Sequence, residues 1–137
     1  MENYFDLKMD PREANAISCL GLAHMGDCVY ELLVRGWLCA HGRTTIQSLH
    51  KETVSFVSAP AQSRFMERLE PLLTSGEEAV YRRGRNTHVH GVPKSATPKE
   101  YARATGLECL FGYLFLTGQQ QRANCLFVTV MEEFYGI

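Results

Sequence analysis

The chain has 137 residues, 45% of them hydrophobic and 21% charged, and its formal net charge is −1. This length suits one substantial hydrophobic core and is short of two, so we expect a single domain over residues 1–137. The N-terminus is too polar for a secretory signal, and no apolar run approaches the ~20 residues of a membrane span. We therefore expect a cytoplasmic protein with no membrane contact.

Apolar residues recur every three to four positions, and no segment alternates with period two for long, which predicts an all-α fold. Asp10, Pro11 and Glu13 have the N-cap, N1 and N3 chemistry of a helix start. A second helix is expected over about residues 26–40, with Asp27 in its first turn.

Later helix starts are marked by a capping residue or a proline, at Thr45, Pro60, Thr74 and Thr97. Residues 84–96 are rich in glycine and polar residues, and we expect them to form a loop long enough to suggest a function. The helix after Thr97 should end at Gly118, and a last helix should follow, for about seven helices in all.

Five cysteines, at positions 19, 28, 39, 109 and 125, form no CxxC pair. All but Cys39 fall within apolar helical patterns. We interpret them as small buried residues in a reducing compartment, and we expect neither a zinc site nor a disulfide framework.

Positive charge is concentrated in one segment, although the net charge is small. Residues 1–78 contain eleven acids and seven Lys or Arg, residues 79–103 one acid and six, and residues 104–137 three acids and one. A basic block of this kind can attract a polyanion, but taken alone it is also typical of a solvated loop.

Two carboxylates lie within apolar helical segments, Asp27 in LAHMGDCVYELLVRGW and Glu108 in YARATGLECLFGYLFLTG. A charge in such surroundings is unfavourable unless it is paired, hydrogen-bonded or bound to a cation. Glu108 has no cationic residue one helical turn away, which favours a divalent metal; a carboxylate hydrogen-bonded within the core is the alternative. Asp27 could also simply cap its helix.

The segment YRRGRN lies between these acids in the chain and has a composition suited to phosphate. Two acids and a basic segment together suggest metal-dependent chemistry on a nucleic-acid backbone. His88 and His90, further along the same loop, are interpreted as incidental.

Three motifs resemble Mini-ribonuclease III, the short relatives of ribonuclease III that consist of the catalytic domain alone. They are Gly26-Asp27 with Val29-Tyr30-Glu31, then Arg82-Arg83-Gly84-Arg85-Asn86, then Ala104-Thr105-Gly106-Leu107-Glu108 through Leu116. Their order and spacing agree with the family, and the resemblance covers about residues 15–134. It implies a helical bundle like the ribonuclease III endonuclease domain.

The resemblance also implies an activity and a site. The protein is expected to be a Mg²⁺-dependent endoribonuclease, with Mn²⁺ as a possible substitute, that cleaves double-stranded RNA and matures the 23S ribosomal RNA precursor. Asp27 and Glu108 match the catalytic acids that bind the metal. RNA-backbone contacts are expected from a basic group made up of Arg82, Arg83, Arg85, Asn86 and Lys94.

A homodimer is expected, because cleavage of both strands of a duplex needs two sites related by two-fold symmetry. Met25, Tyr30 and Leu33 are candidates for the dimer contact, or else ordinary core residues. Ribonuclease III proper has two more acids, and Ala23 and Thr105 occupy those places here. The alternatives to an enzyme are a non-catalytic module that binds structured RNA and a structural subunit in ribosome assembly.

Overall fold

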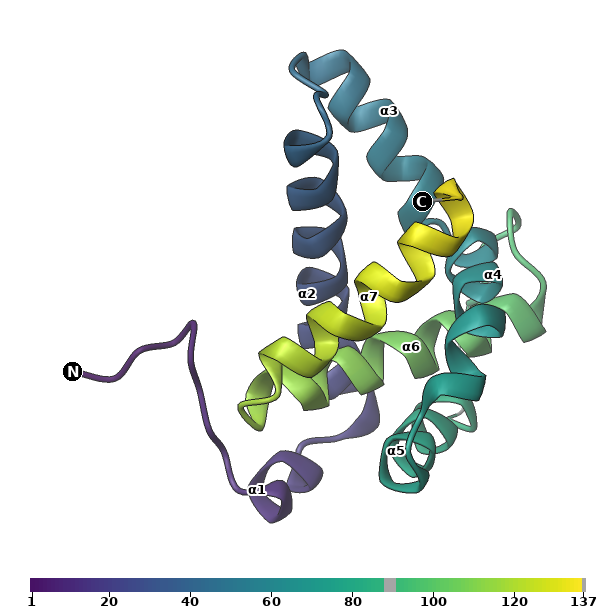
Figure 1. The fold of residues 1–137 in the computed structure, drawn as a ribbon. Coiled ribbons are helices and arrows are strands. Elements are labelled where there is room, and N and C mark those ends of the chain that lie inside the picture. The colour runs from purple at the N-terminus through teal and green to yellow at the C-terminus, as the bar shows by residue number, and fades with distance from the viewer. Residues whose placement is uncertain (88–90, 137) are drawn as a thin grey trace.

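The computed structural model describes residues 1–87 and 91–136, which form seven α-helices and one 3₁₀ helix without any strand (Figure 1). This confirms the all-α expectation. The elements are α1 (Pro11–Ala16), α2 (Cys19–Ala40), α3 (Ile46–Val57), α4 (Ala59–Leu69), η1 (Glu70–Leu72), α5 (Ser75–Arg85), α6 (Pro98–Leu116) and α7 (Gln120–Tyr135).

Most helix starts lie where the local chemistry predicts them. Asp10 accepts a hydrogen bond from the backbone N–H of Arg12, and Thr45 caps α3 in the same way. Thr74 and Thr97 each form a complete capping box with the glutamate three residues later. These are local interactions, so the sequence alone was sufficient to find them.

The start of α2 was placed wrongly. The helix begins at Cys19, because the hydroxyl of Ser18 accepts from the N–H of Gly21 at 3.0 Å and caps it. Helix α2 is therefore 22 residues long, and Asp27 lies in its third turn. Asp27 therefore cannot be the N-cap of this helix, and its interpretation as a helix cap was wrong.

The start of the loop that we expected over residues 84–96 was also placed too early in the chain. Helix α5 continues to Arg85, and Gly84 is buried within it. A Cβ on Gly84 would lie 2.6 Å from the Cβ of Cys109 and 3.0 Å from the Cα of Gly106, so the glycine allows α5 to pack closely on α6. His88 and His90 lie outside the described residues.

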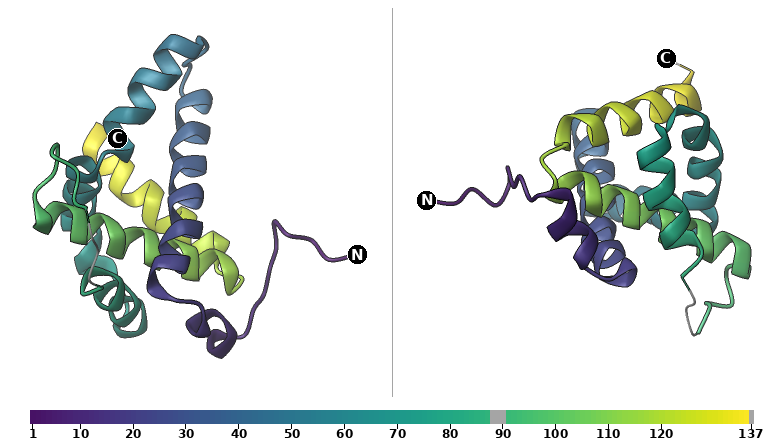
Figure 2. Two further views of the ribbon diagram at one scale, coloured as in Figure 1. Left: turned by 180° about the vertical axis from the view of Figure 1, so that it is seen from behind. Right: turned by 90° about the horizontal axis from the view of Figure 1, so that it is seen from below.

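Helix α6 runs through the centre of the domain, with α2, α4, α5 and α7 packed around it (Figures 1 and 2). Tyr30 of α2 stacks on Phe111 of α6 at 5.8 Å between ring centroids, and Phe65 and Phe127 meet it edge-on. Tyr30 is fully buried and belongs to the core, so it is not available as a dimer contact.

The crossing of α2 over α6 depends on two glycines. A Cβ on Gly26 would overlap the backbone carbonyl oxygen of Glu108, and a Cβ on Gly112 would overlap that of Leu22. The two helix backbones therefore touch at this point, as only glycine permits. This contact fixes the position of Asp27 relative to Glu108.

The cysteine interpretation was right for Cys109, which is buried, but Cys28, Cys39 and Cys125 are exposed. All five are free thiols. In the part of the chain that the structure describes, we find no helix with the length and hydrophobicity needed to cross a bilayer.

Gly26→Ala should destabilise the protein strongly, because the added methyl group meets backbone rather than a side chain that can rotate away. Overpacking of this kind costs about 1–3 kcal/mol or more. Gly36→Ala is the matched control in the same helix: nothing lies within 4 Å of its Cβ position. It should stabilise by up to about 1 kcal/mol through helix propensity. Urea unfolding of both variants measures the difference, and equal stabilities would contradict the close crossing.

Candidate functional site

The structure brings Asp27 and Glu108 together, 81 positions apart in the chain, within hydrogen-bonding reach of each other. Asp27 directly follows Gly26, and the backbone of Glu108 is what Gly26 touches. The close helix crossing is therefore the reason that the two carboxyl groups meet. The sequence analysis expected these two acids to converge, and the structure places them close together.

The two acids differ in their surroundings. Asp27 is exposed, whereas Glu108 is half-buried. Burial, followed by the charge and the hydrogen bond of Asp27, raises the pKa of Glu108 to about 8. The pair therefore holds a proton near neutral pH, and a cation is the natural replacement for that proton.

Gln62 of α4 is the third side chain at the site, and the sequence analysis missed it. Its amide nitrogen Nε2 donates to Oε2 of Glu108 at 3.5 Å and to the carbonyl oxygen of Val57 at 3.2 Å. A signal was present in the sequence, because Gln62 shares a helix face with the buried Phe65, Met66 and Leu69. A polar amide within an apolar stripe indicates a buried partner.

These residues fit a hydrated divalent cation. Among residues 1–87 and 91–136, no group of three or more His, Cys, Asp or Glu side chains is placed to hold a metal. Mg²⁺, however, is commonly held by one or two carboxylates, with water and substrate phosphate as its other ligands. The amide oxygen of Gln62 is buried and has no partner in the part of the chain that the structure describes. Water held by a cation would supply the missing donor.

Ribonuclease III proper has further acids at two positions, and in this chain neither position supplies a carboxylate to the site. Ala23 is buried, and the buried hydroxyl of Thr105 donates to the carbonyl oxygen of Tyr101 at 3.0 Å. Glu31, one turn beyond Asp27, pairs with Arg35 at 2.6 Å, as expected from their spacing. The site therefore has two acids.

The arginines at the end of α5 are exposed or half-buried, and each makes a contact within the protein. Arg82 pairs with Glu78 at 2.7 Å, and Arg83 donates to the side-chain oxygen of Asn15. The guanidinium of Arg85 lies 5.6 Å from the ring centroid of Tyr81. The last turn of a helix favours such cations, because the unpaired carbonyls carry partial negative charge.

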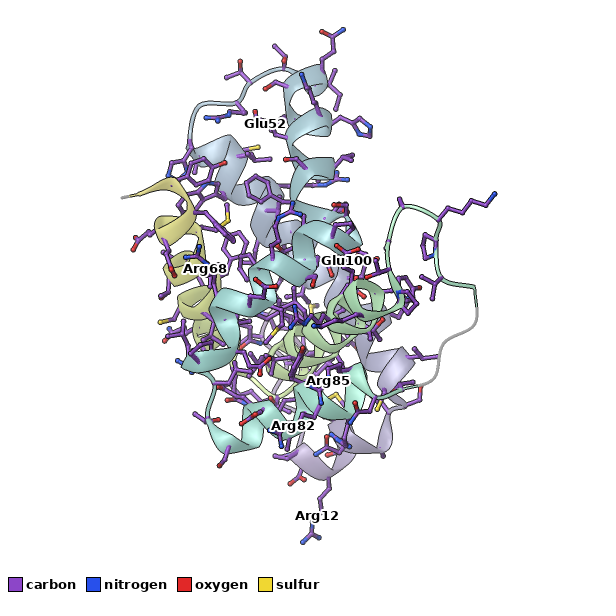
Figure 3. All side chains as sticks on the ribbon, turned by 90° about the vertical axis from the view of Figure 1, so that its right-hand side faces the viewer. Arg12, Glu52, Arg68, Arg82, Arg85 and Glu100 are labelled. Atoms are coloured by element: carbon purple, nitrogen blue, oxygen red, sulfur yellow. The ribbon has the colours of Figure 1, made fainter. Side chains whose placement is uncertain are left out.

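The other two members of the basic group, Asn86 and Lys94, follow α5 in the chain. Figure 3 shows Arg82 and Arg85 together on α5, away from Arg68 near α7. Asn86 accepts from Nε of Arg85 at 3.3 Å, and Lys94 is exposed. Since Gly84 packs against Cys109, the arginines beside it lie next to the part of α6 that carries Glu108.

Comparison with known proteins agrees with this arrangement. The ribonuclease III domain family matches residues 20–119. The crystal structure of a protein from Fusobacterium nucleatum is similar to the chain, with a TM-score of 0.75 and 28% identity, over 85% of this chain and 93% of that one. The helical fold is thus that of a ribonuclease III domain.

Two relatives narrow the assignment. Mini-ribonuclease 3 of Symbiobacterium thermophilum is 48% identical over 77% of this chain and 81% of its own length. Mini-ribonuclease 3 of Streptococcus pneumoniae is 36% identical over 90% of this chain and 98% of its own length. The chain therefore belongs to the Mini-ribonuclease III group of the ribonuclease III family.

The raised pKa of Glu108 predicts a pH-dependent stability of the metal-free protein. The folded state holds a proton between the unfolded pKa of about 4.3 and the folded pKa of about 8, so the free energy of unfolding falls as the pH rises through this window. Glu108→Gln should remove this fall in the free energy of unfolding, because glutamine does not titrate. The variant should match the wild type at pH 5 and be more stable at pH 8.5.

Urea unfolding in chelator at the two pH values measures this difference. Each unit of pKa shift corresponds to about 1.4 kcal/mol, an upper bound for a group that is partly exposed. Glu31→Gln is the control, since Glu31 has an exposed arginine partner. The contrary result is a stability that changes with pH in parallel in the wild type and in Glu108→Gln. That result would show that Glu108 is not buried beside a second acid.

Proposed function

We propose that this protein is a divalent-metal-dependent endoribonuclease that hydrolyses phosphodiester bonds in double-stranded RNA. Membership of the ribonuclease III family and the names of its relatives support the activity. The observation that carries the proposal is the meeting of Asp27 and Glu108 at the helix crossing, next to the arginine-rich end of α5.

Asp27 and Glu108 are the proposed catalytic residues, and they would hold Mg²⁺, or Mn²⁺ in its place. Such a cation activates water near neutral pH and offsets charge on the scissile phosphate and the leaving oxygen. Glu108 would bind the cation in its ionised form. Asp27 is exposed, so a cation held by both acids would be accessible to a substrate phosphate.

Arg82, Arg83, Arg85, Asn86 and Lys94 are the proposed RNA-binding residues. Guanidinium groups bind phosphate oxygens in pairs of parallel hydrogen bonds, and an asparagine can reach a sugar hydroxyl. Recognition would then depend on the A-form shape of the duplex and on 2′-hydroxyls, with little dependence on base sequence.

The natural substrate is proposed to be the 23S ribosomal RNA precursor in the cytoplasm, with residues 1–137 acting as one catalytic domain. Similarity to Mini-ribonuclease 3 proteins along most of their length supports this assignment.

We propose a homodimer, because two sites facing opposite strands cleave a duplex most directly. Leu20, Cys28 and Leu32 form an exposed row along α2, with Leu20 and Leu32 exposing 45% and 58% of their surface. Met25 and Leu33 pack partly against the core. The exposed row is therefore better placed for the dimer contact.

Asp27→Asn and Glu108→Gln should each abolish or severely reduce Mg²⁺-dependent cleavage of a perfect RNA duplex, while binding in chelator is largely kept. Each variant removes one carboxylate ligand and leaves the basic group intact. Gel analysis of a labelled duplex measures cleavage, and Glu31→Gln serves as an active control. Cutting by both variants at the wild-type rate would remove the site assignment, and a wild type that binds but never cuts would indicate a non-catalytic RNA-binding module.

Arg83→Ala and Arg85→Ala should weaken duplex binding in chelator and flatten its salt dependence. Each lost phosphate contact lowers the slope of log affinity against log salt by about one unit. Arg68→Ala, which removes an exposed arginine paired with Glu133, is the matched control. Unchanged slopes in the two test variants, or an equal loss in Arg68→Ala, would show that the end of α5 does not bind the duplex.

A further inference from the structure

Gln62 is held in an environment that would suit an apolar side chain better. Only 1% of its surface is exposed, and it lies on the face of α4 that packs Phe65, Met66 and Leu69 into the core. A buried amide is unfavourable unless all its polar atoms have partners. The question is therefore what each atom of this amide contacts.

The nitrogen of the amide has two acceptors, the carboxylate oxygen Oε2 of Glu108 and the carbonyl oxygen of Val57. The oxygen of the amide, Oε1, is closed to solvent and has no partner among residues 1–87 and 91–136. A buried acceptor in this state is destabilising. If the amide group were turned by 180°, Oε1 would face the oxygens of Glu108 and Val57, neither of which suits an acceptor. These two oxygens therefore fix the orientation of the amide.

The amide holds one oxygen of Glu108 in place, because Nε2 can only donate and Oε2 of Glu108 accepts from it. Glu108 lies at the crossing of α2 and α6, where Asp27 follows Gly26. The oxygen on the other side of the same amide needs a donor, and a water molecule held by a cation between the two acids would be one.

We propose that Gln62 is a positioning residue of the metal site: Nε2 holds one oxygen of Glu108, and Oε1 accepts a hydrogen bond from water bound to the cation. This inference rests on the proposed function, because it assumes that Asp27 and Glu108 bind a divalent cation. Removing a partner of a metal ligand typically costs about 10–100-fold in metal affinity or activity.

The test is Gln62→Met, which keeps the length of the side chain and removes both polar atoms. Mn²⁺ is titrated against the thermal unfolding of the protein without RNA, because a ligand that binds the folded state raises the unfolding temperature. We expect the Mn²⁺ concentration for half-maximal stabilisation to rise by about 10–100-fold. The unfolding temperature of the variant without metal should change little. Removal of the unpaired Oε1 stabilises the variant, whereas Val57 and Glu108 lose the donor Nε2.

Cleavage of an RNA duplex gives the second measurement. The kcat of Gln62→Met should fall, and the Mg²⁺ concentration for half-maximal cleavage should rise, with the KM for the duplex unchanged. Ser63→Ala is the matched control: Ser63 is the next residue, is equally buried, and contacts Arg103 at 3.5 Å instead of Glu108. It should bind Mn²⁺ like the wild type.

Two results would overturn the proposal while the proposed function stands. One is a Gln62→Met variant with wild-type Mn²⁺ dependence. The other is a variant that is less stable without metal but binds Mn²⁺ normally, which would show that Gln62 only packs the core. If the wild type neither binds Mn²⁺ nor cuts RNA, and Asp27→Asn behaves identically, the proposed function fails and this inference fails with it.

Discussion

The contact between the backbones of α2 and α6 is the constraint on which the rest of the molecule depends. Gly26 and Gly112 each lack the Cβ that would overlap the opposite helix. The helices can then approach closely enough for Tyr30 to stack on Phe111 in the core below. Because Asp27 follows Gly26 in the chain, the contact that packs the core also brings the two acids together.

The paired acids are unfavourable for the fold by itself. Burial and the neighbouring acid both oppose ionisation of Glu108, and only Gln62 favours it. The aromatic core and the capped helices supply the stability that holds these groups in place. Sites in which burial shifts the pKa of a carboxyl group are often functional, because the binding of a cation or substrate relieves the cost.

The arginines at the end of α5 are already positioned by contacts within the protein. Glu78 holds Arg82, the ring of Tyr81 supports Arg85, and Asn15 accepts from Arg83. Exposed pairs of this kind contribute little to stability, so exchanging a protein partner for a phosphate costs little. Side chains that are ordered before binding also lose less conformational entropy when they bind.

Local chemistry in the sequence was sufficient to predict most of the helices. The caps at Asp10, Thr45, Thr74 and Thr97 involve residues only two or three positions apart, so their patterns could be recognised directly. The pairing of Asp27 with Glu108 was also anticipated, because acids in apolar helical segments need a shared partner. The start of α2 was missed, since Ser18 is a cap of the same local kind that the analysis passed over.

Two other features depended on contacts that no local pattern contains. Gly84 looked like the start of a loop, but its cost within a helix is offset by close packing against Gly106 and Cys109. The sequence places Gln62 on an apolar helix face, but it does not show that Glu108, 46 positions away, is the partner of its amide. The sequence by itself determined where most of the helices begin and that Glu108 needs a partner. Only the tertiary structure decided which backbones touch and which amide reaches the site, because both depend on helices that are distant in sequence and adjacent in space.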